Sequence, residues 1–422
     1  MSQVPPPRGF VSTLRMVGPG LVVAATGVGA GDLVAAAKAG ALYGLPLLWT
    51  AVLGALLKFV LAEGVARWQM ATGETILEGW AKMLGRPVRI IFLIYLLLWT
   101  FIVSAALMSA CGLAAHALFP QLSVNAWAML HALAGLAFVW RGGYGFFENA
   151  MKWAIGVMFL AIVGSAIFQA PPAAETLRGF LIPTLPEGSS IFVLGVIGGI
   201  GGTLTLLSYN YWLKEKGWSG AAWMRAARVD LGVGYILTGI FGIAVILLGG
   251  LVLLPRGISI SGSNGVLEMA VILAEKFGRP GELVFLIGFW GAVATSLLGV
   301  WQGVPYLFGN YMGLMRGASR EEMTRYTHSR SHLYRAYVLF MTFPPMLLLL
   351  LGKPVWLVIA YAALGALFMP FLASTLLVMN NRRDLGELKN GLLANTGLIL
   401  SLLLFAWLAL NRLSAELSKL MG

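Results

Sequence analysis

The residues of this chain best placed to do chemistry lie inside its first long apolar segment, where alternating glycines precede a carboxylate: Gly27, Gly29, Gly31 and Asp32. Each glycine costs a helix about 1 kcal/mol relative to alanine, so the run predicts a break in the helix. Backbone groups left unpaired at membrane depth are tolerated only where protein or a water-filled cavity satisfies them. An ionisable residue inside a membrane segment is itself typical of a functional site. We therefore expect a binding site here.

A second glycine-rich stretch, residues 198–205, interrupts a later apolar segment and includes Gly201 and Gly202, followed by Thr203 and Thr205. Glycine-interrupted segments at corresponding positions of two halves are typical of inverted repeats that bind a substrate between them. Small residues also let membrane helices pack closely, which is the alternative use of these glycines. Because each cluster exceeds what close packing needs, we favour two broken helices around one site.

The composition assigns the chain to the membrane proteins. Hydrophobic residues make up 59% of the chain and charged residues only 11%, whereas a soluble protein has about 25% charged residues. Segments long enough to cross a hydrocarbon layer of roughly 30 Å lie near residues 13–44, 46–66, 88–117, 123–140, 149–170, 189–213, 229–254, 281–312, 335–352, 354–380 and 391–411. The predicted fold class is an all-α integral membrane protein with 11 transmembrane helices.

The net charge of +12 is explained by the positive-inside rule and does not indicate nucleic-acid binding. With a cytoplasmic N-terminus, 20 of the 29 lysines and arginines lie on the cytoplasmic side, and the C-terminus is extracytoplasmic. We expect a multi-pass monomer of the cell (inner) membrane. Its expected partners are the lipid bilayer and a small solute, and nucleic acid is not among them.

No linker or charge block divides the chain into separate domains, so the predicted organisation follows the repeats. It comprises a cytoplasmic N-terminal segment (1–12), a first five-helix repeat (13–170), an extracytoplasmic linker (171–188), a second five-helix repeat (189–380), and helix 11 with the C-terminal tail (381–422).

Several short motifs, read in order along the chain, resemble the Nramp metal-ion transporter family. They are Gly18-Pro19-Gly20-Leu21, Ala71-Thr72-Gly73-Glu74, Gly143-Tyr144, Pro370-Phe371 and Leu385-Gly386-Glu387-Leu388-Lys389-Asn390. The resemblance covers most of the chain, from about residue 17 to residue 411. It implies a LeuT-like fold of two inverted five-helix repeats, in which helices 1 and 6 are broken. It also implies secondary active transport by alternating access.

The same resemblance places the family's metal ligands on residues that cannot replace them. The family's Asp-Pro-Gly-Asn motif falls on residues 29–32, where the first carboxylate is missing and Asp32 stands in place of the amide. Its Met-Pro-His run in helix 6 falls on residues 203–206, which offer neither a thioether nor an imidazole. Its helix 10 glutamine falls on Ala362. The resemblance therefore implies that the soft-metal site has been dismantled.

Two kinds of substrate fit what remains. Half-helix N-termini offer N–H groups to an anion, and Asp32 could receive an ammonium group, which favours an amino acid or a related small zwitterion. The alternative is a divalent metal ion, Mg²⁺ or Mn²⁺, held by Asp32, threonine hydroxyls and carbonyl oxygens. The expected substrate-binding residues are Thr26, Gly27, Gly29, Gly31, Asp32, Gly201, Gly202, Thr203, Thr205, Tyr209 and Ala362.

Four charged residues are candidates for gating. Glu63 and Arg67 lie four residues apart on one helix face, and Glu148 and Asp230 stand at the starts of later segments. These residues could close the cytoplasmic mouth of the site, or they could form ordinary interfacial salt links.

Two further polar residues bear on coupling and on the pathway. His131 could carry protons or could simply pack in the core, and Gln302 could face the pathway. The coupling ion, H⁺ or Na⁺, stays open. The chain has no combination of nucleophile, base and orienting acid, no phosphate-binding lysine motif and no Cys/His metal spacing, so we expect neither an enzyme nor a cofactor. A receptor that kept the fold but lost transport is the remaining rival.

Overall fold

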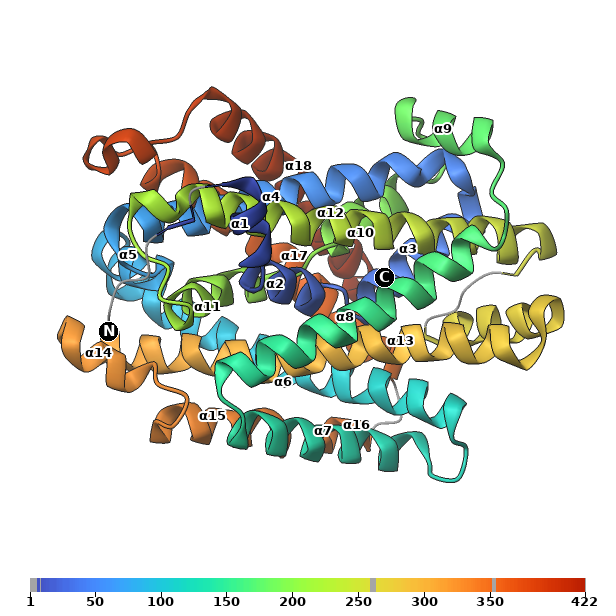
Figure 1. The fold of residues 1–422 in the computed structure, drawn as a ribbon, viewed down its shortest axis with the longest axis horizontal. Helices are drawn as coiled ribbons and strands as arrows, with labels where there is room; N and C mark the ends of the chain where they lie inside the picture. Colours follow the sequence, from blue (N-terminus) through green and yellow to red (C-terminus); the bar gives the residue numbers. More distant parts are fainter. Residues whose placement is uncertain (1–5, 8, 259–262, 351–353, 422) are drawn as a thin grey trace.

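A computed structural model describes residues 6–7, 9–258, 263–350 and 354–421 of the chain. For some of these residues, including Asp32, Ala362 and the last turns of the chain from residue 411, only the backbone is described. All regular secondary structure within the described residues is helical (Figure 1). The predicted all-helical class is therefore confirmed.

Each predicted membrane segment corresponds to helix in the structure. Seven of the described helices are long and apolar enough to cross a membrane, judged by length and composition. The total of 11 crossings stays a prediction. Apart from the first and sixth segments, the helices at the predicted positions are α4 (Leu48–Thr72), α6 (Gly85–Leu118), α7 (Val124–Arg141), α8 (Tyr144–Ile167), α12 (Met224–Leu248), α13 (Ser263–Met315), α15 (His332–Thr342) with α16 (Met346–Leu349), α17 (Pro354–Met379) and α18 (Leu392–Met421). A non-helical residue, Gly278, divides α13.

The first long segment is broken into α2 (Pro19–Gly27) and α3 (Ala30–Tyr43). Only Val28 and Gly29 are non-helical, so the break is narrower than the sequence predicts. Asp32 is the third residue of α3, and a carboxylate in the first turn of a helix is favoured by the helix dipole. The amides of that turn need no helical partner, so glycine at residue 31 does not stop the helix there.

The sixth segment is broken more widely. The helix α10 (Ser190–Gly199) ends before four non-helical residues, and the chain resumes with the short 3₁₀ helix η2 (Leu204–Ser208) and with α11 (Tyr209–Glu215). Gly201 and Gly202 have φ angles of +86° and +83°. Side chains disfavour this left-handed backbone, so glycine is required at both positions.

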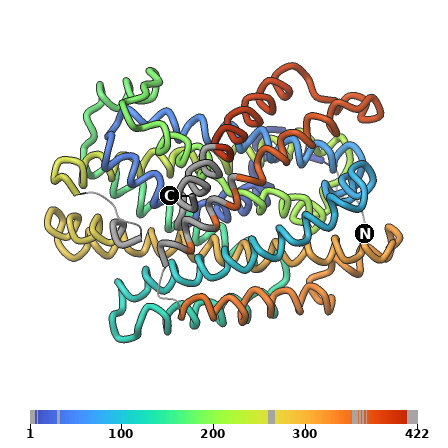
Figure 2. The backbone as a smooth tube through the Cα atoms, turned by 180° about the vertical axis from the view of Figure 1, so that it is seen from behind, coloured from blue at the N-terminus to red at the C-terminus, as the bar shows by residue number. Residues whose placement is uncertain are grey.

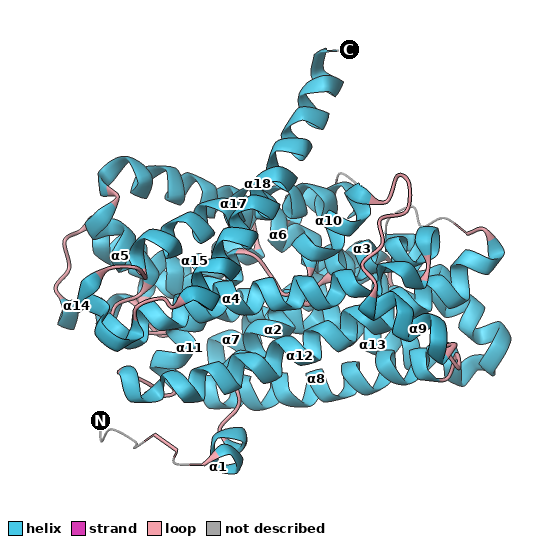
Figure 3. Ribbon diagram, turned by 90° about the horizontal axis from the view of Figure 1, so that it is seen from above, coloured by secondary structure: helices cyan, strands magenta, loops and turns pink. Residues whose placement is uncertain are grey.

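The two broken helices lie inside the bundle. The half-helix α2 packs against α12 and α13, and Figure 3 shows α2 beside α12 in the middle of the molecule. From the opposite side, Figure 2 shows α17 and α18 running close together, and these two helices are in contact. The breaks are thus surrounded by helices from both halves of the chain, which fixes the position of the candidate site.

Candidate substrate site at the helix breaks

The two breaks touch each other directly through glycine backbone. A Cβ atom added to Gly27 would lie 2.3 Å from the carbonyl carbon of Gly201 and 2.3 Å from the nitrogen of Gly202. No side chain fits at such a distance, so these three glycines allow one half-helix to approach the other. Close packing and helix breaking are therefore combined at the same residues.

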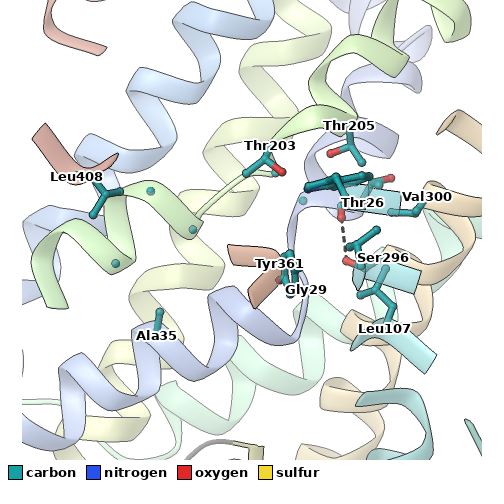
Figure 4. A pocket seen from close by; sticks show the side chains of 17 residues that line it. Thr26, Gly29, Ala35, Leu107, Thr203, Thr205, Ser296, Val300, Tyr361 and Leu408 are labelled. Atoms are coloured by element: carbon teal, nitrogen blue, oxygen red, sulfur yellow. Dashed lines mark hydrogen bonds between the residues drawn. The ribbon is translucent and has the colours of Figure 1, made fainter. Parts of the chain in front are cut away.

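A cavity of about 100 Å³ adjoins this contact. Its polar lining consists of hydroxyl-bearing side chains, which Figure 4 shows around the ends of the half-helices: Thr26, Thr203, Thr205, Ser296 and Tyr361. The other lining residues are glycine or apolar, apart from the indole N–H of Trp99, which cannot ligate a metal ion. Within the described part of the chain, no three His, Cys, Asp or Glu side chains come together as a metal-binding group. Oxygen is therefore the donor atom that the described lining offers.

Thr26 and Ser296 join α2 to α13 at one wall of the cavity. The Thr26 hydroxyl donates to the carbonyl of Val22 at 2.6 Å, and the Ser296 hydroxyl donates to the carbonyl of Thr26 at 2.9 Å (Figure 4). A Cβ atom on Gly299 would lie 1.8 Å from the Thr26 hydroxyl oxygen, so the wall is tightly packed. Each hydroxyl uses its hydrogen in one of these bonds, and the lone pairs of its oxygen stay available to a ligand.

Thr203 and Thr205 form another wall, on the unwound part of the sixth segment. They alternate with Leu204 and Leu206, which are completely buried. A Cβ atom on Gly365 would lie 2.6 Å from the Thr203 methyl carbon, so α17 packs tightly behind this wall. Residues 203–206, where the family's methionine and histidine ligands are missing, therefore present hydroxyl groups to the cavity.

Ser296 and Tyr361 were not anticipated from the sequence. A serine in a membrane helix commonly bonds to a carbonyl of its own helix, so Ser296 gives no signal of a cavity. Tyr361 adjoins the predicted Ala362, and its hydroxyl would lie 3.6 Å from a Cβ atom on Gly29. The side chains of Ala362 and Asp32 lie outside the described residues, as does the environment of Gly31. Their binding roles stay predictions.

Tyr209 has a different place from the one expected. It does not line the cavity, and its hydroxyl donates to the Asp230 carboxylate at 2.8 Å. The same carboxylate accepts from the amides of Gly18 at 2.8 Å and Gly20 at 2.6 Å. Asp230 thus caps the N-terminus of α2 and satisfies amides that have no partner within the helix.

The other charged candidates gather at the same end of the bundle. Glu63 on α4 accepts bonds from Arg67 of its own helix and, at 2.9 Å, from Arg228 of α12. Arg67 also donates to the carbonyl of Leu388 at 3.0 Å. These contacts connect two helices to the segment before α18, as a closed gate or an interfacial salt link would.

Glu148 completes this end of the structure. It forms ion pairs with Lys152 at 2.6 Å and Lys216 at 3.1 Å. A Cβ atom on Gly18 would lie 2.0 Å from a Glu148 carboxylate oxygen. The residue before α2 is therefore enclosed by Glu148 and held by Asp230.

His131 and Gln302 lie elsewhere. The Nδ1 atom of His131 is 2.7 Å from the Trp127 carbonyl, and its Nε2 atom accepts from Trp290 at 2.8 Å. Gln302 is buried, accepts from Trp212 and donates to Tyr306. Neither residue lines the cavity. A role of His131 in proton transfer stays a prediction.

Comparison with known proteins decides the family. A family model described as "Nramp: Natural resistance-associated macrophage protein-like" matches residues 20–415. The chain belongs to the Nramp family. This confirms the resemblance of the sequence motifs and assigns the chain to a family of multi-pass membrane transporters.

Similar Nramp relatives are named for metal transport. The "Divalent metal cation transporter MntH" of Mycobacterium leprae is 22% identical over 313 residues, which cover 70% of each chain. The protein of the same name from Chromohalobacter salexigens is 28% identical over 195 residues. That match covers 43% of this chain and 42% of the relative, so it spans less than half of either protein.

Solved structures agree with the expected LeuT-like fold. A manganese transporter from Eremococcus coleocola, solved with an aromatic bis-isothiourea compound, is similar with a TM-score of 0.75 and 16% identity. The similarity covers 100% of this chain and 91% of that one. MhsT in complex with L-phenylalanine gives a TM-score of 0.51 at 16% identity, covering 92% and 98% of the two chains. At these sequence identities, the similarity supports the fold and no shared substrate.

The predicted amino-acid substrate is wrong. The Nramp family and its relatives named for divalent metal cations support the alternative, metal ion transport. The cavity lining gives one physical reason for the error, because hydroxyl oxygens are ligands for a hard metal ion as well as partners for a zwitterion. The glycines that were expected to receive a substrate carboxylate instead contact one another.

Proposed function

We propose that this Nramp chain transports a divalent metal ion through a site made of oxygen ligands. The observation that carries the proposal is the hydroxyl-lined cavity at the contact between the two helix breaks. Family membership and the names of the relatives support a metal ion as the substrate class.

The lining favours hard ions. Mg²⁺ prefers oxygen ligands and keeps several of its waters, and Mn²⁺ also accepts oxygen ligands, whereas softer ions gain from sulfur. Thr26, Thr203 and Thr205 would contact the ion directly or through its waters. Asp32, in the first turn of α3, would supply the negative charge. Mg²⁺ and Mn²⁺ are therefore the proposed substrates, and Cd²⁺ should be a poor one.

The direction of access follows from where the cavity extends. It is lined by Ala35 of α3 and by Gly195 and Gly198 of α10, on the side of the breaks away from Asp230. With the N-terminus in the cytoplasm, this side faces outward. We infer that Asp230, Glu63 and their partners close the cytoplasmic end while the ion binds from outside.

Uptake by proteoliposomes tests the proposal. The purified chain should accumulate Mg²⁺ or Mn²⁺ faster than empty liposomes, and Asp32→Ala should abolish most of this uptake. Asp384→Ala is the matched control, because Asp384 is exposed, pairs with neighbouring Arg382 and does not line the cavity. Uptake that is absent for every divalent ion, or equal in wild type and Asp32→Ala, would overturn the proposal.

A further inference from the structure

A groove of about 440 Å³ runs along the outside of the bundle between α4 and α12, two helices that lie side by side (Figures 1 and 3). Its buried lining includes Ala55, Tyr235 and Gly239, and its exposed lining includes Leu56 and Ile236. Every residue of the lining is glycine or carries an apolar or aromatic side chain. The groove therefore suits a hydrocarbon chain and not a polar ligand.

The length of the groove matches the depth of one membrane leaflet. On α12 the lining extends from Gly232 to Ile243, which is a rise of roughly 16 Å at 1.5 Å per residue. One leaflet contributes about half of the roughly 30 Å hydrocarbon layer. A single acyl chain that enters from the membrane surface would therefore fill the groove.

Two exposed arginines of α12 continue the groove toward the end of the bundle that holds Asp230. Arg225, Arg228 and Gly232 follow one another at spacings of three and four residues, so they lie on one helix face. Arg228 donates from Nε to Glu63 at 2.9 Å, yet 46% of its side-chain surface stays exposed.

The charge at this end of the groove is positive. Glu63 is shared between Arg228 and Arg67, so its one negative charge does not neutralise both guanidinium groups. A guanidinium group carries five N–H donors in a planar arrangement that fits phosphate oxygens. Anionic lipids are attracted to basic residues at a membrane surface by roughly fivefold in affinity for each lysine or arginine.

We propose that this groove binds one anionic glycerophospholipid, with an acyl chain between α4 and α12 and the phosphate at Arg225 and Arg228. Lipid covers every outer face of a membrane protein, but here a hollow one leaflet deep begins beside exposed arginines. The bound chain contacts Tyr235, whose hydroxyl donates to the Gly201 carbonyl at 3.3 Å. The lipid thus supports the packing beside the sixth-segment break, whichever ion the chain transports.

Lipid binding by the purified full chain tests the inference, and native mass spectrometry counts the bound molecules. Wild type should retain one dioleoyl phosphatidylglycerol at concentrations roughly tenfold below those required for dioleoyl phosphatidylcholine. Gly232→Leu should lose this molecule, because a Cβ atom on Gly232 points into open space with nothing within 4 Å. The larger side chain then occupies the groove.

Gly164→Leu is the matched control for the groove. Gly164 lies on α8, is half-buried as Gly232 is, and also has nothing within 4 Å of an added Cβ atom. It should retain phosphatidylglycerol as wild type does. An equal loss of lipid in this control would overturn the assignment of the molecule to the groove.

Arg225→Gln tests the phosphate contact. It should weaken binding of phosphatidylglycerol roughly fivefold and leave binding of phosphatidylcholine unchanged. Arg325→Gln is its control, because Arg325 is an equally charged, exposed residue of α14 (Arg320–Tyr326), a helix that packs against α13. If Arg325→Gln weakens binding as much, the effect is one of total charge, and the headgroup site is overturned.

Two further results would overturn the proposal. Glycerophosphoglycerol, the headgroup without acyl chains, should not displace the lipid from wild type, and tight binding of this compound would exclude a role of the groove. A dimer of the chain that Gly232→Leu dissociates would assign the groove to a second copy. If Gly232→Leu does not fold, wild type, Arg225→Gln and the headgroup compound still decide the outcome.

Discussion

Tyr209 donates its hydroxyl to the Asp230 carboxylate at 2.8 Å, and through this bond α11 holds the acid that caps α2. Asp230 lies on α12, so one carboxylate joins three helices. Backbone contact reinforces the junction, since a Cβ atom on Gly20 would lie 2.3 Å from the Asp230 carbonyl oxygen. In the proposed transport, opening the site at this end would separate the start of α2 from Asp230.

Replacing Asp230 with asparagine should loosen the start of α2. Asparagine has one acceptor oxygen for the amides of Gly18 and Gly20 and the Tyr209 hydroxyl, and hydrogen bonds to a charged group contribute about 1.5–3 kcal/mol. Hydrogen exchange of the amides in residues 18–22 should accelerate by roughly tenfold to a hundredfold. Exchange takes place in the intact protein, which is then digested, and mass spectrometry of the peptides measures this change.

Asp384→Asn is the control for that experiment, because Asp384 is exposed and accepts hydrogen bonds from the neighbouring Arg382. It should leave exchange in residues 18–22 unchanged. Equal protection in wild type and Asp230→Asn would show that Asp230 does not hold α2.

Ser296→Ala should destabilise the wall between α2 and α13. The Thr26 carbonyl stands at the C-terminal end of α2, where it lacks a helical partner, and the Ser296 hydroxyl supplies one. Losing it should cost about 1–3 kcal/mol, because a buried acceptor is left unsatisfied. Thermal unfolding in detergent should show a lower midpoint.

Ser165→Ala provides the comparison. Ser165 is also buried, but its hydroxyl donates to the Ala161 carbonyl of its own helix. Its removal should lower the midpoint much less than Ser296→Ala does. Equal losses would indicate that the bond to Thr26 has no special weight.

Thr205→Cys should make the cavity attractive to soft ions. The substitution places sulfur in a lining that otherwise offers oxygen among its described donors, and softer metals favour thiolate ligands. Cd²⁺ should then inhibit Mn²⁺ uptake at concentrations roughly tenfold lower than in the wild type. The native Cys111 is buried in α6 and does not line the cavity, so it should not interfere.

Thr238→Cys adds a buried thiol away from that cavity, since Thr238 bonds to Gly234 within α12. It should leave Cd²⁺ inhibition at the wild-type level. If both cysteine variants gain the same sensitivity, Thr205 is not a position that the ion reaches.

Gly27→Ala should damage both the fold and uptake. Its methyl group would lie 2.3 Å from backbone atoms of Gly201 and Gly202, and overpacking of this kind costs about 1–3 kcal/mol. Gly156→Ala, on α8, has nothing within 4 Å of the added methyl and should keep or raise stability. Unfolding midpoints and Mn²⁺ uptake of the two variants provide the measurement. Wild-type behaviour of Gly27→Ala would show that the half-helices can separate freely.

The fold could be predicted because composition and glycine clusters act locally. Apolar length predicts membrane helices, and the glycines near Gly27 and Gly201 predict broken ones. The sequence could not give the exact width of the first break. Helix propensity penalises Gly31, whereas the first turn of α3 tolerates it because those amides lack helical partners in any case.

The site was harder to predict because its parts come from distant segments. Ser296 and Tyr361 reach the cavity only through the packing of α13 and α17, and no local pattern marks them. Lys58 on α4 shows the same difficulty, since its ammonium group donates to the carbonyl of Gly202, 144 residues away in the sequence. The prediction of the substrate class was wrong for another reason. Glycines that let a carboxylate approach the backbone equally let another backbone segment approach it.

The contact between Gly27 and Gly201 couples the positions of the two helix breaks. No side chain separates these two backbones, so the end of α2 cannot move toward the sixth segment without displacing the backbone of that segment. Gly201 is in turn bonded to Tyr235 of α12, the helix that also carries Asp230. In the proposed transport, release at the cytoplasmic end would therefore be coupled through α12 to any rearrangement at the two breaks.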